Sequence, residues 1–369
     1  MKMAYHSLPV ENGDIPGTVN SFLGGLLKDG KVTAVLALQE TPSGKSAFPA
    51  MVSDPDRLAT NVFAPLLPVS IGTMVSKMTK IRGSAKPVAV VLRSCELRAL
   101  TELMKLHQGD LANITLIGVD CPGTFPMNTY SSFPDAKGPT NAILNGEDAD
   151  KYMRSACLNC KDPVPETADI VVGIFGTDIE KELYIEDRTE AGAALIKGAK
   201  LKKLKDDKAR NKAVEEVRKE RDSNREAFIR SHSDIKGIDK LTEFFDTCVN
   251  CHNCMKACPI CYCKECLFDS SVFDLEAGKY VAKAEGKGAY KTPTDSLLFH
   301  ITRFNHMILS CVECGLCEQA CPSNIPLMDI ITAIAENAQK EFEYVPGRDP
   351  EEQMPMIVYR EEEFQDVGE

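Results

Sequence analysis

Two cysteine motifs in the C-terminal half constrain this chain more than any other feature of its sequence. The motif CVNCHNCMKACP starts at Cys248, and the related motif CVECGLCEQACP starts at Cys311. The chain holds fifteen cysteines, but it shows no N-terminal secretory signal and no apolar run of the ~20 residues that cross a bilayer. We therefore expect a cytoplasmic protein without a membrane span, in which clustered thiols bind metal or do redox work instead of forming disulfides.

Each motif has the spacing x2, x2, x3 and ends in a proline, which is the pattern of a two-cluster ferredoxin domain. In that pattern the fourth cysteine of each motif ligates the cluster of the other motif. The spacing predicts one 4Fe–4S cluster at Cys248, Cys251, Cys254 and Cys321, and a second at Cys311, Cys314, Cys317 and Cys258. Zinc is the alternative, but zinc sites usually pair two CxxC knuckles across a spacer.

Three further thiols follow the first motif at Cys261, Cys263 and Cys266. They lack a fourth partner nearby, and His252 is the only imidazole close to them in the sequence. They could complete a small zinc site or be buried apolar residues beside the clusters. We favour the second interpretation.

The spacer between the motifs contains an expected amphipathic helix in DSLLFHITRFNHMILS, with Asp295 near its start. Leu297, Ile301, Phe304 and Ile308 recur at helical spacing, which predicts a buried stripe. His300 and His306 are expected to be ordinary surface or core residues of this helix and not metal ligands.

The N-terminal half alternates between strand and helix patterns. Short β-branched runs predict buried strands at 31–39, 87–94, 114–120 and 168–176. The segment 95–109 between the second and third runs has a helical apolar face, and Ser94 is placed to cap it. Strand–helix–strand order indicates parallel strands in a layered α/β domain.

Four cysteines of this half have positions that suggest a third site. Cys95 and Cys121 follow two of the predicted parallel strands, so both should lie at the carboxyl edge of the sheet, where α/β proteins bind ligands. Cys157 and Cys160 form an x2 pair before the strand at 168–176, in a loop that would have to fold back over the sheet. The four thiols could hold a third 4Fe–4S cluster. The alternative is two ordinary buried cysteines and a CxxC zinc knuckle.

Charge and composition divide the rest of the chain. The net charge of −11 argues against nucleic-acid binding. We expect an α/β domain at 1–200, a charged helical connector at 201–240, an α-rich two-cluster ferredoxin-like domain at 241–335 and an acidic tail at 336–369. The connector should be solvated, because it carries i,i+4 pairs such as Glu226 with Arg230.

The N-terminal half resembles the beta-subunit family of coenzyme F-420-reducing hydrogenases and formate dehydrogenases. The resemblance lies in SCELRAL, GVDCPGT, CLNCKDPVPETADIVVGIFG and the ending ELYIEDRTEAGAALIKGA, and it covers most of residues 10–200. The C-terminal ferredoxin motifs suit the formate dehydrogenase branch. The segment GTVNSFLGGLLKDGKVTAVL is similar to the glycine-rich loop and helix of this family, although its helix is expected to start only near Thr18 or Asn20.

This resemblance implies an FAD in the α/β domain and a neighbouring 4Fe–4S cluster at Cys95, Cys121, Cys157 and Cys160. It suggests Gly17, Thr18 and Asn20 as flavin-binding residues, and it names no catalytic residue. The resemblance also implies an anaerobic oxidoreductase subunit that passes electrons between a separate catalytic formate dehydrogenase or hydrogenase chain and a two-electron carrier, either deazaflavin or NAD(P). A flavin suits that task because it exchanges a hydride with one partner and single electrons with another.

A second interpretation, with the same cofactors, is that the chain is a non-catalytic hub. It would link formate dehydrogenase or hydrogenase to a heterodisulfide-reductase-like flavoprotein. Both readings share every predicted cluster ligand.

Overall fold

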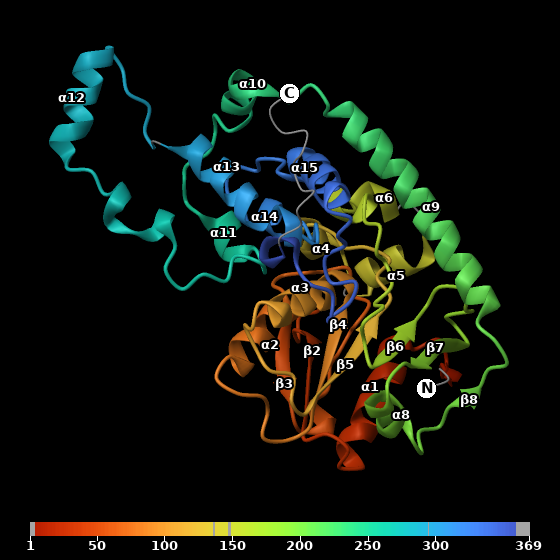
Figure 1. Cartoon of the computed structure of the whole chain (residues 1–369). Coiled ribbons are helices and arrows are strands. Elements are labelled where there is room, and N and C mark those ends of the chain that lie inside the picture. Colours follow the sequence, from red (N-terminus) through yellow and green to blue (C-terminus); the bar gives the residue numbers. More distant parts are fainter. Residues whose placement is uncertain (1–3, 136, 147–148, 294, 359–369) are drawn as a thin grey trace.

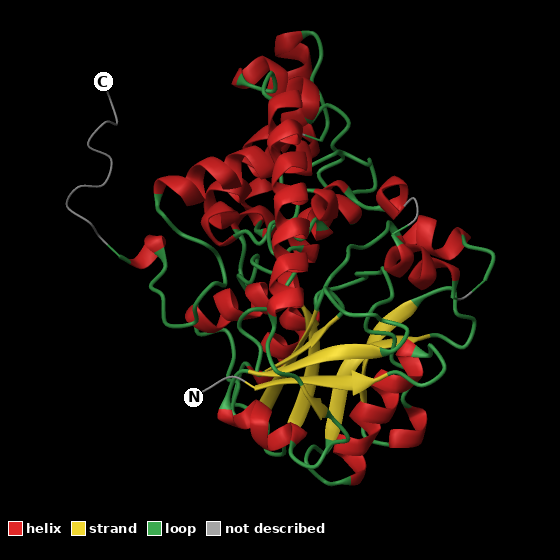
Figure 2. Ribbon diagram, turned by 90° about the vertical axis from the view of Figure 1, so that its right-hand side faces the viewer, coloured by secondary structure: helices red, strands yellow, loops and turns green. Residues whose placement is uncertain are grey.

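The computed structural model describes residues 4–135, 137–146, 149–293 and 295–358. The chain forms a sheet with helices on both faces and, above one edge of that sheet, a helical part that contains both ferredoxin motifs (Figures 1 and 2). The architecture is thus the expected α/β domain joined to an α-rich domain. None of the helices in the described ranges is both long and apolar enough to cross a lipid bilayer.

Eight strands form one mixed sheet in the order β3-β2-β4-β5-β6-β7-β1-β8. Strands β2, β4, β5 and β6 are parallel, while β3, β7, β1 and β8 pair antiparallel with their neighbours. The strands are β1 (Ala4–Pro9), β2 (Ala34–Glu40), β3 (Ala47–Val52), β4 (Val88–Arg93), β5 (Ile114–Val119), β6 (Ile170–Gly173), β7 (Glu182–Asp187) and β8 (Lys202–Lys203).

The four parallel strands are those that the apolar runs predict. Their side chains are buried on both faces, as in β4, where all six residues are buried. Edge strand β3 is apolar but contains Pro49 and is not a β-branched run, and edge strand β8 consists of two exposed lysines. The β-branched pattern therefore predicts neither of them. Strand β8 also lies beyond residue 200, the expected end of the α/β domain.

Helices cover both faces of the sheet. On one face α1 (Ile15–Lys28) and α8 (Glu190–Ile196) pack on the larger apolar cluster, which includes Leu23 and Val35. On the other face α2 (Ile71–Thr79) and α3 (Ser94–Lys105) pack on a second cluster around Leu97. Short helices follow in the segment between β5 and β6: α4 (Met127–Ser132), α5 (Gly138–Asn145), α6 (Ala149–Tyr152) and α7 (Ser155–Leu158).

The start of α3 differs from the expected cap. Ser94 is the first residue of the helix, and its hydroxyl donates to the Val164 carbonyl at 3.1 Å instead of accepting from the helix. The buried carboxylate of Glu96 does the capping, because it accepts from the backbone N–H groups of Arg93 and Ile71 at 3.0 and 2.7 Å. This ties α2 and α3 together at the carboxyl edge of the sheet.

The connector is a single long helix, α9 (Lys208–Ser231), which runs along one side of the molecule (Figure 1). It is helical as expected, but it is not uniformly solvated. Arg210, Val214, Arg221 and Arg225 lie on one helical face and are buried. The connector therefore packs against the body, and its arginines contribute to the site described below.

The helical part contains α10 (Gly237–Phe244), α11 (Asn253–Ala257), α12 (Ala277–Lys287), α13 (Ser296–Met307), α14 (Leu316–Gln319) and α15 (Met328–Glu341). The predicted helix between the motifs is α13, and Phe304 and Ile308 of its predicted stripe are buried. Ile301 is 46% exposed, so the prediction was wrong for that residue, because the buried face turns toward Phe299 and Arg303 instead.

The segment after α15 returns to the α/β domain. The Tyr344 hydroxyl donates to Glu102 on α3 at 2.6 Å, and the Gly347 N–H donates to the same carboxylate at 2.8 Å. The first part of the expected acidic tail is therefore packed structure up to this point. Residues 359–369 of that tail lie outside the described residues.

Candidate functional site

The four cysteines of the N-terminal half come together in one pocket. Cys95 is the second residue of α3, just after β4, and Cys121 lies just after β5. Cys157 lies in α7 and Cys160 follows it. All four line the same pocket at the carboxyl edge of the sheet. Among the described cysteines none forms a disulfide, so these thiols remain free to act as ligands.

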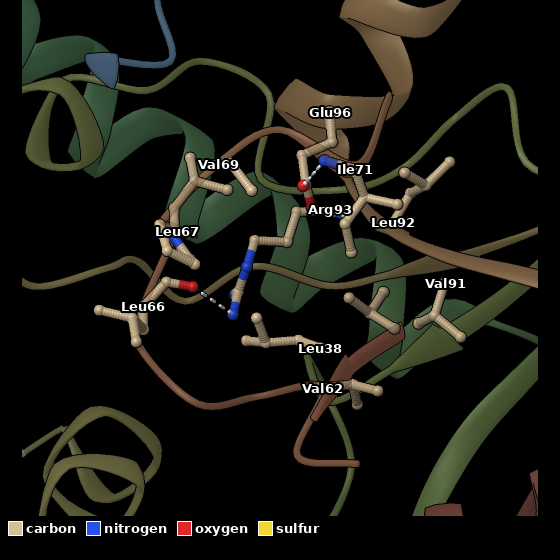
Figure 3. Close-up of a pocket in the computed structure, with 12 residues that line it drawn as sticks. Leu38, Val62, Leu66, Leu67, Val69, Ile71, Val91, Leu92, Arg93 and Glu96 are labelled. Carbon is tan, nitrogen blue, oxygen red and sulfur yellow. Dashed lines mark hydrogen bonds between the residues drawn. The ribbon is translucent and has the colours of Figure 1, made fainter. Parts of the chain in front are cut away.

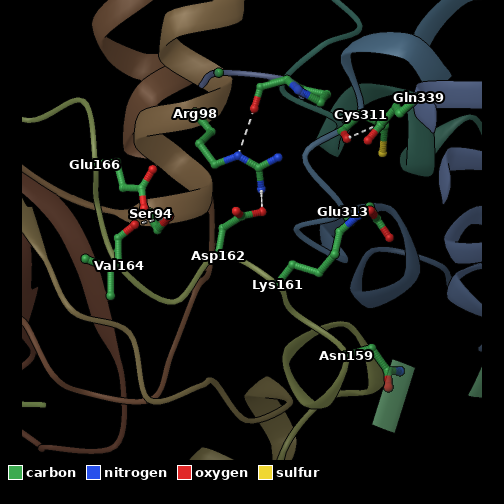
Figure 4. A network of polar contacts seen from close by, with 12 residues as sticks. Ser94, Arg98, Asn159, Lys161, Asp162, Val164, Glu166, Cys311, Glu313 and Gln339 are labelled. Carbon is green, nitrogen blue, oxygen red and sulfur yellow. Dashed lines mark hydrogen bonds and ion pairs between the residues drawn. The ribbon is translucent and has the colours of Figure 1, made fainter. Parts of the chain in front are cut away.

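The loop after Cys160 reaches this edge by folding back over it, as the thiol-cluster hypothesis requires. The Cys121 N–H donates to the Pro163 carbonyl at 2.9 Å, and Val164 accepts from Ser94. Arg98 on α3 forms an ion pair with Asp162 in the same loop, and Figure 4 shows both side chains between α3 and the loop. These contacts hold the Cys157–Cys160 segment against the ends of β4 and β5.

The surroundings of these thiols are buried and cationic. Burial raises the pKa of Cys160 to about 11, although the Arg221 guanidinium acts in the opposite direction. Burial also opposes ionisation of Cys157, but the guanidinium of Arg154 and the Thr124 hydroxyl outweigh it and lower the pKa of that thiol. A metal centre deprotonates coordinating thiols outright, which removes the cost of keeping buried thiols ionised.

Arg154 fits an anionic group at this site. Its side chain is buried, its Nη2 lies 3.7 Å from the Cys157 sulfur, and its Nη1 has no hydrogen-bond partner among the described residues. An unpaired buried guanidinium is costly unless a negative charge faces it. Four thiolates around an iron–sulfur cluster would supply that charge.

The second ferredoxin motif forms a comparable pocket. Its lining includes Cys311, Cys314 and Cys317 together with Cys258 from the first motif, which is the crossed set predicted from the spacing. Gln339 on α15 donates to the carbonyls of Ile308 and Cys311, each at 2.9 Å, and thereby holds the start of this motif (Figure 4).

The remaining set, Cys248, Cys251, Cys254 and Cys321, is nearer to solvent. The charges of Cys321 and Cys251 both add to burial in raising the pKa of the Cys248 thiol, so the four sulfurs are electrostatic neighbours. Cys251 is exposed, whereas Cys254 is buried. This set therefore lies at the outer end of the group of cysteines.

Two side chains of α13 contact the thiols. Arg303 is 3% exposed, its Nε and Nη2 lack partners among the described residues, and its charge faces Cys317, Cys254 and Cys258. His300 is stacked on Phe245, and its Nε2 lies 3.4 Å from the Cys248 sulfur. Burial lowers the pKa of His300 to about 3, so it is a neutral core residue beside the thiols.

Cys261, Cys263 and Cys266 do not converge on one point. The Cys261 thiol is hydrogen-bonded to Cys258, the Cys266 sulfur lies 3.5 Å from the Met255 sulfur, and Cys263 is exposed. Within the described ranges no group of three or more His, Cys, Asp or Glu side chains surrounds a single metal ion.

Cys314 connects the two halves of the molecule. It belongs to the second ferredoxin motif, yet it also lines the pocket of the N-terminal thiols, and its charge acts on Cys95. Gly315 beside it has φ of 69°, and a Cβ there would lie 2.6 Å from the Cβ of Ala156. Glycine is required at this point because the two halves approach so closely.

A buried ion network reinforces this junction. Arg225 of α9 makes a two-pronged ion pair with Glu313, whose two oxygens lie 2.8 and 3.0 Å from its nitrogens, and it also donates to Glu336 at 2.8 Å. Glu313 lies between Cys311 and Cys314 (Figure 4), and Lys161 next to Cys160 pairs with Glu336. The network links α9, α15 and both cysteine-bearing loops.

The three residues suggested for flavin binding do not all line one pocket. Helix α1 starts at Ile15, earlier than expected, and the Asp14 carboxylate accepts from the Gly17 N–H at 3.1 Å. A carboxylate at that position opposes phosphate binding. Gly17 and Thr18 line a surface groove, whereas Asn20 exchanges two hydrogen bonds with the Thr60 backbone.

A small pocket next to the thiols is the other cavity at this edge. Figure 3 shows its apolar lining, which includes Leu38, Val62 and Val91, with Arg93 reaching across it. Leu67 and Arg93 also line the thiol pocket, and the Arg93 Nη1 lies 3.8 Å from the Cys121 sulfur. The two cavities are therefore neighbours.

Sequence reasoning missed the arginines of the site. Arg210 makes a two-pronged pair with the buried Asp120 at 2.7 and 2.8 Å, and Arg221 donates to the Pro122 carbonyl at 2.7 Å. The available signal was the spacing of Arg210, Arg221 and Arg225, which places them on one helical face of α9.

Two family models match separate parts of the chain. Residues 85–212 match the model of the C-terminal part of the coenzyme F420 hydrogenase/dehydrogenase beta subunit. Residues 243–325 match the 4Fe-4S dicluster domain model. Together they cover the thiol pocket at the sheet edge and both ferredoxin motifs.

Curated relatives extend over nearly the whole chain. It is 28% identical to F420-dependent formate dehydrogenase 1 subunit beta of Methanococcus maripaludis, covering 93% of both chains. It is 26% identical to F420-dependent formate dehydrogenase subunit beta of Methanocaldococcus jannaschii, covering 90% of this chain and 92% of the relative.

A solved structure is also similar. It is a chain of the F420-reducing [NiFe] hydrogenase complex from Methanosarcina barkeri, with 14% identity and a TM-score of 0.46. The match covers 64% of this chain and 94% of that chain.

Proposed function

We propose that this chain, which matches the model of the coenzyme F420 hydrogenase/dehydrogenase beta subunit over residues 85–212, is the electron-transfer subunit of an F420-dependent formate dehydrogenase. It passes electrons between a separate catalytic chain and the deazaflavin carrier. The observation that carries this proposal is the position of Cys314, which lines the N-terminal thiol pocket while belonging to a ferredoxin motif.

Three 4Fe–4S clusters fit the cysteines. The proposed ligand sets are Cys95, Cys121, Cys157 and Cys160 at the sheet edge, then Cys258, Cys311, Cys314 and Cys317, and finally Cys248, Cys251, Cys254 and Cys321. The unpaired guanidinium atoms of Arg154 and Arg303 support an anionic group at these positions. Each cluster would supply a one-electron centre.

Buried side-chain contacts hold the cysteine-bearing segments close to one another. Arg225 and Glu313 fix the loop that carries Cys311 and Cys314 against α9. Phe245, Phe299 and Phe304 share one apolar cluster with the buried Cys254 and Cys258, whereas Cys251 is exposed. Burial of Cys254 and Cys258 and a fixed approach of the two halves favour transfer between neighbouring centres without reorganisation of the protein.

A flavin is part of the proposal, and its contacts stay a prediction: Gly17 and Thr18 line a surface groove at α1, whereas Asn20 is hydrogen-bonded to Thr60. When bound, a flavin exchanges a hydride with the carrier and single electrons with a cluster. The pocket of Figure 3 adjoins the thiol pocket, but its free volume of about 20 Å³ is that of about one water molecule, so it has no room for a flavin ring.

An activity measurement tests the function. We expect the purified chain, prepared without oxygen and containing FAD, to transfer electrons from reduced coenzyme F420 to a viologen dye. Thr18→Trp, in the groove lined by Gly17 and Thr18, should lower both FAD content and this turnover, while the iron content stays unchanged. A chain that binds iron but is silent with the deazaflavin would support the hub linked to a heterodisulfide-reductase-like flavoprotein and contradict our proposal.

A further inference from the structure

Residues 262–293 form an arm between the two ferredoxin motifs. Its first part is anchored on the body by the buried Phe268, and its second part, around α12, extends away from the body (Figure 1). Helix α12 in this arm buries none of its residues. Globular proteins form helices mainly by packing an apolar face, so an isolated surface helix of eleven residues gains little from its own body. The region around α12 is therefore the part of the described chain with the least internal support.

The helix of the arm is basic in an acidic protein. Residues 277–291 contain four lysines and one glutamate, whereas the whole chain has a net charge of −11. Lys279, Lys283 and Lys287 recur every four residues and therefore lie along one side of α12. Within the described ranges none of these three forms an ion pair with a carboxylate, and Lys283 donates instead to the Tyr290 hydroxyl at 2.9 Å.

Apolar side chains accompany the lysines. Leu267, Val272 and Val281 are 55%, 69% and 57% exposed. Protein interfaces combine exposed apolar residues with charges of the sign opposite to that of the partner. Over residues 262–293 five lysines offset five acidic residues, so the positive charge is confined to α12 and the residues just after it. Helix α12 is therefore the part of the arm whose charge suits an acidic protein.

One end of the arm follows Cys261, which is hydrogen-bonded to Cys258 of the middle set. The other end returns at α13, whose His300 lies 3.4 Å from the Cys248 sulfur of the outermost set. Cys251 of the same set is exposed. A protein held by the arm would therefore approach the most accessible of the proposed clusters.

We propose that this arm is a docking surface for a redox protein with an acidic face, whose own one-electron centre is thereby brought close to Cys251. The inference rests on the proposed electron-transfer function. Electrostatic attraction between the lysines and the acidic face raises the association rate and orients the encounter.

Stopped-flow measurement of electron transfer tests this proposal. The full chain, reduced without oxygen, is mixed with an acidic plant-type 2Fe–2S ferredoxin as the probe, at low and at high ionic strength. We expect a rate constant that falls with salt, and a loss of about tenfold at low salt in the variant Lys279→Glu, Lys283→Glu, Lys287→Glu. The matched control is Lys202→Glu, Lys203→Glu, Lys205→Glu, which makes the same charge change around β8, on the opposite side of the molecule (Figure 1).

Three results would overturn the docking role. They are a salt-independent rate, an unchanged rate in the arm variant, or an equal loss in both variants. A dimer that the arm variant dissolves in sedimentation would assign the arm to a second copy of the chain. Acceleration on removing residues 359–369, seen only while the lysines are present, would assign it to the chain's own end.

Oxidation by methyl viologen, a small cationic dye, separates these outcomes from failure of the proposed function. Both variants should reduce the dye at the parental rate, because the dye does not require docking on the arm. A parental chain that fails to reduce the dye would contradict the electron-transfer function itself.

Discussion

Two buried arginines indicate what the cysteine sites of this chain bind. Arg154 and Arg303 each place guanidinium atoms without partners among the described residues beside cysteines that burial would otherwise keep protonated. An isolated buried charge is strongly destabilising, whereas a charge opposite an anionic cluster is compensated. These two arginines therefore argue for clusters independently of the cysteine spacing.

Replacing Arg303 should change the reduction potential of a neighbouring cluster. A reduced cluster carries one more negative charge than an oxidised cluster, so the Arg303 cation stabilises the reduced form. Arg303→Met should lower the midpoint potential by about 60 mV, which for one electron is a tenfold change in the equilibrium constant. An EPR-monitored redox titration measures this change.

Arg303→Lys is the control, because it keeps a positive charge in the same place and should leave most of the potential unchanged. Equal potentials in Arg303→Met and in the parent would show that the guanidinium does not face a redox centre.

Helix α9 is the element that joins the two halves of the molecule. Its buried arginines reach Asp120 in the sheet, the carbonyls after β5, and Glu313 in the second ferredoxin motif. The i,i+4 charge pattern correctly predicts the helix. The exposed ion pairs that form this pattern do not show that the opposite face of α9 is buried. Partners of a buried arginine lie about 90 residues away in the chain, as for Arg210 and Asp120, so local spacing cannot identify them.

The ion network of α9 and α15 should make stability depend on pH. Burial alone would raise the pKa of Glu336, but Lys161 and Arg225 outweigh it and hold the pKa below 4.5. Glu336 therefore contributes stability above the unfolded-state pKa of about 4.3, and this contribution is lost as the pH falls through its lower folded-state pKa. Glu336→Gln should reduce the unfolding free energy by about 1 kcal/mol at pH 7 and by less at pH 4.

Urea-induced unfolding at both pH values measures this dependence. Glu341→Gln, an exposed position at the end of the same helix, is the control and should have little effect at either pH. A loss for Glu336→Gln that is the same at pH 7 and pH 4 would contradict the role of the ion pairs.

The segment after α15 should stabilise α3 through one carboxylate. Glu102 is fully buried and accepts from the Tyr344 hydroxyl and the Gly347 N–H. Tyr344→Phe removes the hydroxyl donor to a charged group and should cost about 1.5–3 kcal/mol of unfolding free energy. Amide exchange at 342–350 should become faster.

Tyr290→Phe is the matched control, since its hydroxyl is bonded to a lysine of the arm. If both variants lost the same free energy, the contact with Glu102 would have no special importance.

At the scale of the whole molecule, the sequence predicts the pieces better than it predicts their arrangement. Buried parallel strands and the motif spacing follow from local patterns, so the α/β and ferredoxin-like parts and all three cysteine sets could be named. The approach of Cys314 to Cys95 could not, because it depends on Gly315 packing against Ala156 from the other half. The residues suggested for flavin binding stay a prediction, although Asp14 already accepts from the Gly17 N–H in the first turn of α1.

This close approach makes three neighbouring iron–sulfur centres the central claim of the account. Anaerobic determination of iron and zinc in the purified chain tests it most directly. The account predicts about twelve irons per chain, four for each cubane cluster, and about eight irons in a Cys95→Ser variant. About eight irons and one zinc in the parental chain would contradict it, because the thiols at the sheet edge would then hold no cluster.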